Sequence, residues 1–224
     1  SNGNPPQYPS AFTKWKYFDW IQPIEITQGG TYTLNPLSLQ DSVAYTIASP
    51  YSETEYFIVE YRKQEGMYES NAQGSRSGLL AYRVNPDAGD GNAQGPPDEL
   101  YVYRPGGTLT NSGNLNNAPY NPSYGQIELN DNTDPSSFLY NGGAGGIGGL
   151  NLYDVTEASE TISFTVSFGV PEMQISPNFL SYELEVGEFG SQPITISNVG
   201  EEGTVLNFSA IVSSADSYTN PQGG

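Results

Sequence analysis

The chain contains no histidine and no cysteine, and these two absences exclude most familiar catalytic and metal-binding sites. Without histidine there can be no Ser-His-Asp triad, no imidazole general base and no histidine-ligated zinc. Without cysteine there can be no disulfide, no thiolate zinc site and no cysteine nucleophile. Any catalysis by these residues alone would have to use carboxylates, tyrosine, lysine or a hard metal ion.

Positive charge and long apolar stretches are also scarce. The 224 residues include 7 Lys and Arg against 25 Asp and Glu, which gives a formal net charge of -18. Binding to nucleic acid or to an anionic membrane surface is disfavoured, because both depend on lysine and arginine meeting phosphate groups. Calcium or a cationic partner suits this charge better. No stretch is apolar for long enough to span a bilayer, and the first residues do not resemble a signal peptide.

Residues that form turns and strands are abundant. The chain has 26 Gly, 17 Pro and 17 Tyr, and only 14% of its residues are charged. A polar but weakly charged composition of this kind is typical of extracellular β domains and differs from that of disordered chains. The length suffices for one large domain or two small ones. We therefore predict a mostly β protein that is secreted or displayed at a cell surface.

One short helix is predicted near the N-terminus. Ser10 can cap it, and "AFTKWKYFDW" follows directly. Phe12, Trp15 and Phe18 recur at helical spacing and predict a single apolar stripe. Such a stripe is more often packed in a core than used to bind a ligand, so we interpret it as core.

From Ile24 onward the apolar residues alternate, which predicts an antiparallel β-rich domain. Gly29-Gly30 separates "IEIT" from "TYTLNPL" and predicts a hairpin between them. A polar loop is expected over 64–77. The segment "NGGAGGIGGLNL" lacks the Lys-Ser/Thr ending of a phosphate-binding loop and is expected to be a tight surface turn. The other predicted strands are "VAYTIA", "TEYFIVEYR", "GLLAYRVN", "ELYVYRP", a short "GQIEL" and "ETISFTVSF".

A domain boundary is predicted at Val170-Pro171, which gives domains of residues 1–169 and 170–224. The second segment shows short strands with Gly or Pro turns, the pattern of an immunoglobulin-like β-sandwich. About four strands can be recognised where such a sandwich needs about seven, so we expect a partial domain that continues beyond these residues. The expected strands are in "MQISP", "LSYELEVGE", "QPITISNVG" and "VLNFSAIVSS".

Five segments of the first domain, in this order and spacing, resemble the immune inhibitor A family of secreted bacterial zinc metalloproteases. The resemblance covers roughly residues 5–168 and concerns the part of that family that follows the zinc motif. One departure is Phe18-Asp19-Trp20, which stands where the family often has Leu-Gly-Trp. The segments are "PSAFTKWKYFDWIQPIEIT", "EYFIVEYRKQEG", "SGLLAYRVN", "DGNAQGPPDELYVYRPGGTLT" and "ETISFTV".

The resemblance implies that this chain has a non-catalytic role within a larger enzyme. The family cleaves peptide bonds with a zinc-activated water, using a His-Glu-x-x-His motif that is followed by a Met-containing turn. None of these residues is present, so no catalytic residue can be carried over and this chain alone is expected to be inactive. It would be the β-rich portion that follows the catalytic half, supports it and helps to wall the substrate cleft. Its partners would be that catalytic half and the protein substrates.

One loop is a candidate calcium site. Calcium binds six to eight oxygen atoms on a chain that can bend tightly. Here several carboxylate and amide side chains alternate with glycines, although the spacing is not that of an EF-hand. The alternative is an acidic turn in which Asp and Asn side chains cap backbone amides, and the same alternative is favoured for a second acidic segment, "ELNDNTD". The candidate ligands are Asp87, Asp90, Asn92, Asp98 and Glu99.

Glu60 and Arg62 lie two residues apart on one predicted strand and therefore share a face of it. They are a candidate polar pair that could be buried between the protease halves or touch substrate. A surface salt bridge is the simpler interpretation.

Two further functions stay open on the residues themselves. The tyrosines, tryptophans and Asn-rich loops also fit an extracellular module that binds glycans or proteins and has no protease activity. A purely structural, calcium-stabilised domain is the third hypothesis. A glycosidase would need two carboxylates that face each other across a cleft, and chance pairs are certain among 25 acidic residues.

Overall fold

The computed structural model confirms a mostly β fold and divides the chain into two compact units, Ser1–Gly169 and Val170–Gly224. Each unit is described separately below. Within the described residues, no helix is long and apolar enough to cross a membrane. The structure describes residues 7–39, 43–70, 76–92, 97–169, 172–185, 187–200, 206 and 208–211.

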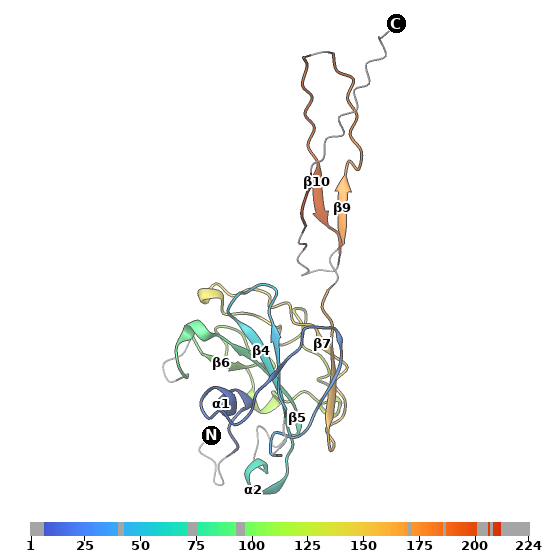
Figure 1. Ribbon diagram of the computed structural model, residues 1–224. Coiled ribbons are helices and arrows are strands. Elements are labelled where there is room, and N and C mark those ends of the chain that lie inside the picture. The colour runs from blue at the N-terminus through green and yellow to red at the C-terminus, as the bar shows by residue number, and fades with distance from the viewer. Residues whose placement is uncertain are drawn as a thin grey trace. The chain divides into compact units, whose positions relative to one another are not determined.

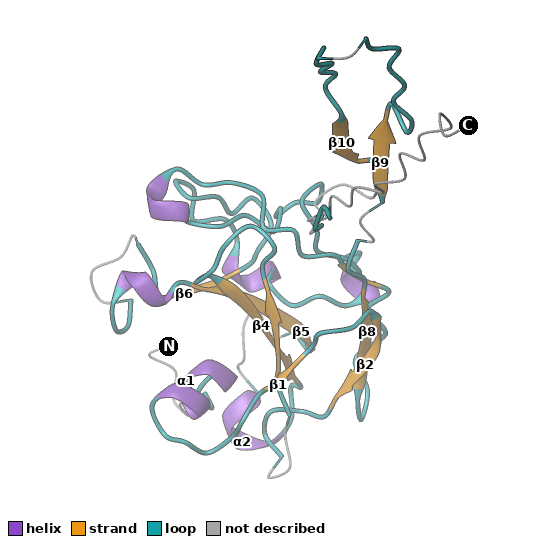
Figure 2. Cartoon of the chain, turned by 45° about the horizontal axis from the view of Figure 1, so that its top comes forward, coloured by secondary structure: helices purple, strands orange, loops and turns teal. Residues whose placement is uncertain are grey.

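The centre of the first unit is a five-stranded sheet with the strand order β1-β3-β4-β5-β6 (Figures 1 and 2). β1 pairs with β3 in parallel, and the other three pairs are antiparallel. All seven residues of β5 are buried, because this strand is covered on both faces. The strands are β1 (Ile24–Glu25), β3 (Tyr45–Ala48), β4 (Tyr56–Arg62), β5 (Gly78–Val84) and β6 (Leu100–Val102).

A second sheet of three strands has the order β2-β8-β7, with β2 (Gly30–Leu34), β8 (Ile162–Val166) and β7 (Leu152–Tyr153). The predicted hairpin at Gly29-Gly30 is therefore wrong, since β1 and β2 belong to different sheets. β2 instead pairs with β8 along its whole length, from Gly30 opposite Val166 to Leu34 opposite Ile162. That pairing buries the apolar side of β2, which the two exposed residues of β1 could not do.

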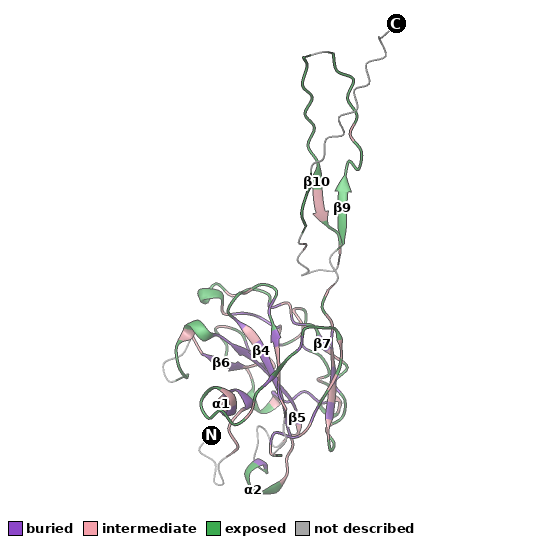
Figure 3. Cartoon of the chain, in the orientation of Figure 1, coloured by how far each residue is buried: buried purple, intermediate pink, exposed green. Residues whose placement is uncertain are grey.

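The alternation of side chains along β4 supplies two separate cores, one on each face of the central sheet. Figure 3 shows that buried residues of the first unit are concentrated in the strands of this sheet. Phe57, Val59 and Tyr61 join the larger core, which includes the inner side of the three-stranded sheet. Ile58 points to the opposite face, where helix α1 (Ala11–Lys16) and Phe12 cover it. Burial of each such side chain contributes about 1.5–3 kcal/mol, so both faces stabilise the unit.

Short helical turns occupy several connections. The predicted polar loop over 64–77 contains the four-residue helix α2 (Gly66–Glu69), which was not expected. The first part of the glycine-rich segment forms a surface turn, as predicted, that includes the 3-10 turn Asn141–Gly143, whereas Leu150 and Leu152 at its end are buried in the core. Its Gly148 and Gly149 N–H groups donate to Asp131 of the second acidic segment. The remaining 3-10 turns are Pro86–Ala88, Leu115–Asn117 and Pro122–Tyr124.

The described part of the second unit contains one antiparallel pair, β9 (Met173–Ser176) with β10 (Thr195–Asn198). Both strands were predicted. The predicted strand over 180–188 is not formed by its described residues. Half of "VLNFSAIVSS" lies outside the described residues, and the described half, 206 and 208–211, forms no strand. All four residues of β9 are exposed, so this pair makes little core of its own.

Candidate functional site

Helix α1 begins where the sequence predicts and ends earlier. The Ser10 hydroxyl accepts a hydrogen bond from the N–H of Thr13 at 3.2 Å, as expected of an N-cap. The regular helix stops at Lys16, and Asp19 takes a left-handed conformation with φ 53°. The N–H of Asp19 donates to the carbonyl of Trp15, which closes the helix. The predicted apolar stripe is therefore correct for Phe12 and wrong for its last member, residue 18, which lies beyond the helix.

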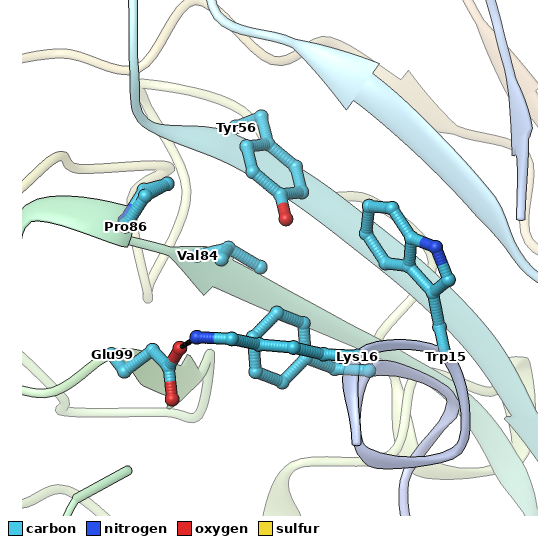
Figure 4. A pocket seen from close by; sticks show the side chains of 7 residues that line it. Trp15, Lys16, Tyr56, Val84, Pro86 and Glu99 are labelled. Carbon is cyan, nitrogen blue, oxygen red and sulfur yellow. Dashed lines mark hydrogen bonds and ion pairs between the residues drawn. The ribbon is translucent and has the colours of Figure 1, made fainter. Parts of the chain in front are cut away.

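A pocket of about 350 Å³ opens beside α1, between the helix and the ends of the inner strands β4 and β5 (Figure 4). The Trp15 and Tyr56 rings lie edge to face, with centroids 6.4 Å apart. The Tyr56 hydroxyl points into the space in Figure 4 and has no hydrogen-bond partner among the described residues. Burial raises the pKa of Tyr56 to about 12, so the hydroxyl stays protonated at neutral pH. The lining residues are Phe12, Trp15, Lys16, Tyr56, Val84, Pro86 and Glu99.

The polar side of this pocket is an ion pair between Lys16 and Glu99. Lys16 also lies 2.6 Å from Asp90, and the two carboxylates raise the pKa of its ammonium group. Glu99 is buried and further accepts hydrogen bonds from the Tyr17 hydroxyl at 2.8 Å and the Gly91 N–H at 2.6 Å. Burial alone would raise the pKa of Glu99, but the contact with Lys16 and the hydrogen bonds from Gly91 and Tyr17 outweigh it and lower the pKa. The pocket therefore presents a fixed cation, a fixed anion and an unpaired hydroxyl beside aromatic walls.

The five candidate calcium ligands do not converge on one site, because their side chains contact different partners. Asp90 and Glu99 converge, but on the Lys16 ammonium. Asp87 accepts a hydrogen bond from the Thr54 hydroxyl at 2.9 Å.

The remaining candidate ligands lie elsewhere. The amide of Asn92 exchanges two hydrogen bonds with the backbone of Leu100. Asp98 lines a different hollow at the end of β6. The described residues contain no group of three or more Asp and Glu arranged to hold a metal ion. Calcium at this loop stays a prediction, and an ion placed between Asp90 and Glu99 would have to compete with Lys16.

Glu60 and Arg62 form an ion pair of 2.7 Å, and the interpretation as a surface salt bridge is wrong. Glu60 is fully buried under the N-terminal segment, where it accepts hydrogen bonds from the Ala11 N–H and the Tyr82 hydroxyl. Arg62 also lies 2.6 Å from Glu69 of α2. The pair is therefore part of the interior of the first unit and does not reach its surface.

Two neighbouring groups complete this buried cluster. Burial and the nearby Arg62 charge lower the pKa of Lys14, whose ammonium donates to the Leu37 carbonyl at 2.6 Å. Burial raises the pKa of Glu69, and one of its oxygens, Oε2, has no hydrogen-bond partner among the described residues. The network links the N-terminal segment, β4 and α2.

Sequence reasoning missed a second buried pair, Glu55 with Arg83. The Arg83 Nε lies 3.4 Å from the Glu55 carboxylate, and its guanidinium lies within 6 Å of three ring centroids. The two residues are 28 positions apart and face each other only because Arg83 on β5 pairs with Phe57 on β4. The sequence signal that could have revealed this pair is the presence of its two charged residues in predicted strands that are otherwise mostly apolar.

Comparison with protein-family models, with curated proteins and with solved structures finds no match to this chain. The functional argument therefore rests on the residues and their geometry.

Proposed function

We propose that this chain is the non-catalytic, β-rich portion of a secreted zinc metalloendopeptidase of the immune inhibitor A type. The chain itself does not fit a zinc site, because it has no histidine or cysteine and its described carboxylates form no group that could hold a metal. Its role is to support the catalytic half and to form part of the substrate cleft.

The observation that carries the proposal is where the five resembling segments lie. Four of them supply α1, β1, β4, β5 and β6, which are the helix and most of the central sheet. The fifth supplies β8 of the second sheet. Segments separated by more than a hundred residues thus meet in one packed unit, as expected if they form one structural element of the family.

Asp19 adds an independent point of agreement. It stands where the family often has glycine, and its φ of 53° lies in the left-handed region that favours glycine. Asp is one of the few other residues that tolerate this conformation. The departure in sequence therefore keeps the backbone turn that the family pattern implies.

The surface after α1 fits contact with the catalytic half. Phe18 and Trp20 stack with centroids 4.5 Å apart, and the side chains are 45% and 63% exposed. Tyr17 beside them is also exposed. The resemblance places this segment shortly after the Met-containing turn, so the occupant of this aromatic patch would be the catalytic half. Exposed aromatic residues that cluster in this way are typical of interfaces.

The test is to read the coding DNA upstream of Ser1 and to assay the full gene product. We expect a His-Glu-x-x-His motif with a Met-containing turn, and protein cleavage that a zinc chelator abolishes. The 224-residue chain alone should show no cleavage with added zinc. A start codon and signal peptide directly before Ser1 without the motif, or chelator-sensitive cleavage by the isolated chain, would overturn the proposal.

The aromatic patch can be tested with the catalytic half expressed separately. Phe18→Ser with Trp20→Ser should weaken its binding to this chain, whereas Ile127→Ser, which changes another exposed apolar residue, should not. Equal effects of both changes would argue against this surface as the contact.

An extracellular binding module is the second candidate, and the pocket beside α1 favours it. Trp15 can stack on a sugar ring, while Tyr56, Lys16 and Glu99 offer a hydroxyl, a donor and an acceptor. A glycan array would test this function. Specific binding that is lost in Tyr56→Phe, which removes only the hydroxyl, would favour the module, whereas an array without a specific signal would exclude glycans.

A further inference from the structure

A second pocket lies on the other side of the Trp15–Tyr56 pair, and its volume is about 280 Å³. Strand register explains how it forms. Glu25 on β1 is opposite Thr46 on β3, and Ala48 on β3 is opposite Tyr56 on β4, so their side chains lie on the same face of the sheet as α1. The pocket is the part of this face that the short helix leaves uncovered.

The pocket is acidic, and its walls contain no cation. Glu25, Glu53 and Glu55 line it together with the two aromatic rings, whereas none of the seven lysines and arginines does. Glu55 already accepts hydrogen bonds from the N–H groups of Tyr140 and Asn141 at 2.8 and 2.6 Å. Glu25 and Glu53 are exposed and have no hydrogen-bond or ion-pair partner among the described residues.

The position of Glu53 is fixed by the turn that carries it. The Ser52 hydroxyl accepts hydrogen bonds from the N–H groups of Thr54 and Glu55 at 3.2 and 2.9 Å. The Thr54 hydroxyl in turn donates to Asp87. These hydrogen bonds fix the backbone that carries Glu53, while its carboxylate stays exposed at the wall of the pocket.

We propose that this pocket binds the guanidinium group of an arginine side chain, presented by a basic peptide segment of a partner or substrate protein. Carboxylates beside tryptophan and tyrosine rings are the chemistry that recognises an organic cation, and arginine also stacks on rings. The net charge of -18 attracts such a segment over distance. The protein holds its own Arg83 in the same manner, between Glu55 and three aromatic rings. The proposal does not depend on the protease function.

The experiment compares two probes that differ only in charge. N-acetyl-arginine amide carries the guanidinium, and N-acetyl-citrulline amide replaces it with a neutral urea of nearly the same shape. The chain has two tryptophans, so Trp20→Phe leaves Trp15 as the only tryptophan reporter. In 150 mM salt, the arginine probe should change Trp15 fluorescence and bind roughly tenfold more tightly than the citrulline probe.

Variants then locate the binding site. Glu25→Gln with Glu53→Gln should weaken the arginine probe roughly three- to tenfold, because both unpaired carboxylates are lost. Glu128→Gln with Glu157→Gln removes two exposed carboxylates outside the pocket and should leave binding unchanged. Equal affinity for the two probes would overturn the proposal that the pocket recognises a cation. Equal losses of affinity in the two double variants would overturn it as well, because the arginine probe would then be attracted by the net negative charge and not by this pocket.

Discussion

The face of the central sheet that α1 covers carries two ionic clusters that differ chiefly in burial. In the inner cluster, Arg62 lies between Glu60 and Glu69, and all three side chains are almost inaccessible to water. In the outer cluster, Lys16 lies between Asp90 and Glu99, and only Glu99 is buried. Both place one cation between two carboxylates. The comparison shows that one cation between two carboxylates can be a buried ion-pair network that joins parts of the fold, or can line a pocket, depending on which residues cover it.

The largest expected effect comes from removing the cation of the inner cluster. Arg62→Met removes the cation that both buried carboxylates contact directly and leaves only the nearby Lys14 ammonium, which should lower the free energy of unfolding by about 3–5 kcal/mol. Urea denaturation measures the loss. Lys63→Met, one residue along the chain, removes a cation whose partners Glu65 and Glu160 are more exposed, and should lower the free energy of unfolding far less. Similar losses in both variants would contradict the importance of burial.

The two clusters should also respond to pH with opposite sign. The pKa of Glu99 is lowered in the folded state, so its stabilisation is present above its unfolded value of about 4.3 and is lost as pH falls through the folded pKa. Glu99→Gln should cost about 2 kcal/mol at pH 7, because hydrogen bonds to a charged group are lost, and little in acid.

Glu69 provides the contrast. Burial raises its folded pKa, so ionising it disfavours the folded state, and that penalty grows as pH rises above about 4.3. Relative to wild type, Glu69→Gln should therefore gain stability with rising pH, while Glu99→Gln loses it. Urea midpoints measured from pH 3 to 7 decide this, and parallel curves for the two variants would show that burial does not set the sign.

Removing the cation of the outer cluster should have a smaller and salt-dependent effect. Lys16→Met should cost about 1 kcal/mol at low ionic strength, because Glu99 keeps its hydrogen bonds from Tyr17 and Gly91. The loss should shrink in 0.5 M NaCl, since salt screens exposed charges more than buried ones. The cost of Arg62→Met, measured in the same two buffers, should stay nearly constant. If the stability loss of Lys16→Met does not change with salt, the outer cluster is as shielded from solvent as the inner one.

Calcium offers a test of the outer cluster from the ligand side. If the loop over 87–99 binds the ion in its native state, calcium at ten times its Kd should raise the free energy of unfolding by about 1.4 kcal/mol. The melting temperature should therefore rise with calcium and fall with a chelator. Lys16→Met should strengthen the response, because it removes the cation that the ion must displace. A melting temperature that ignores calcium in both proteins would leave this loop as an acidic turn.

The smallest expected effect is a gain at the end of α1. Asp19→Gly should raise the free energy of unfolding by about 0.5–1 kcal/mol, because glycine adopts the left-handed conformation without steric cost. Asp19→Ala, which has a Cβ and no polar side chain, should lower it. Calorimetry of the three proteins gives the order, and a stabilising alanine would show that the turn relaxes.

Local features of the fold could be predicted from the sequence because each depends on residues close together in the chain. The Ser10 cap and the start of α1 follow from one polar residue before an apolar spacing. The strands β4 and β5 follow from runs of apolar and aromatic residues, and the glycine-rich segment was recognised as a turn. The predicted hairpin failed because Gly30 is itself the first residue of β2, and its partner is Val166 of β8, which lies far along the chain.

What the sequence determined by itself is the range of possible chemistry: without histidine or cysteine, and with 25 acidic residues against 7 basic ones, only carboxylates, hydroxyls and aromatic rings are plentiful. Only the tertiary structure decided how these groups are used. Lys16 meets Glu99 across 83 residues, and the Ala11 N–H meets Glu60 across 49. Such contacts are set by strand register and by the short helix that covers one side of the sheet and leaves pockets beside it, and neither is encoded in any single stretch of residues.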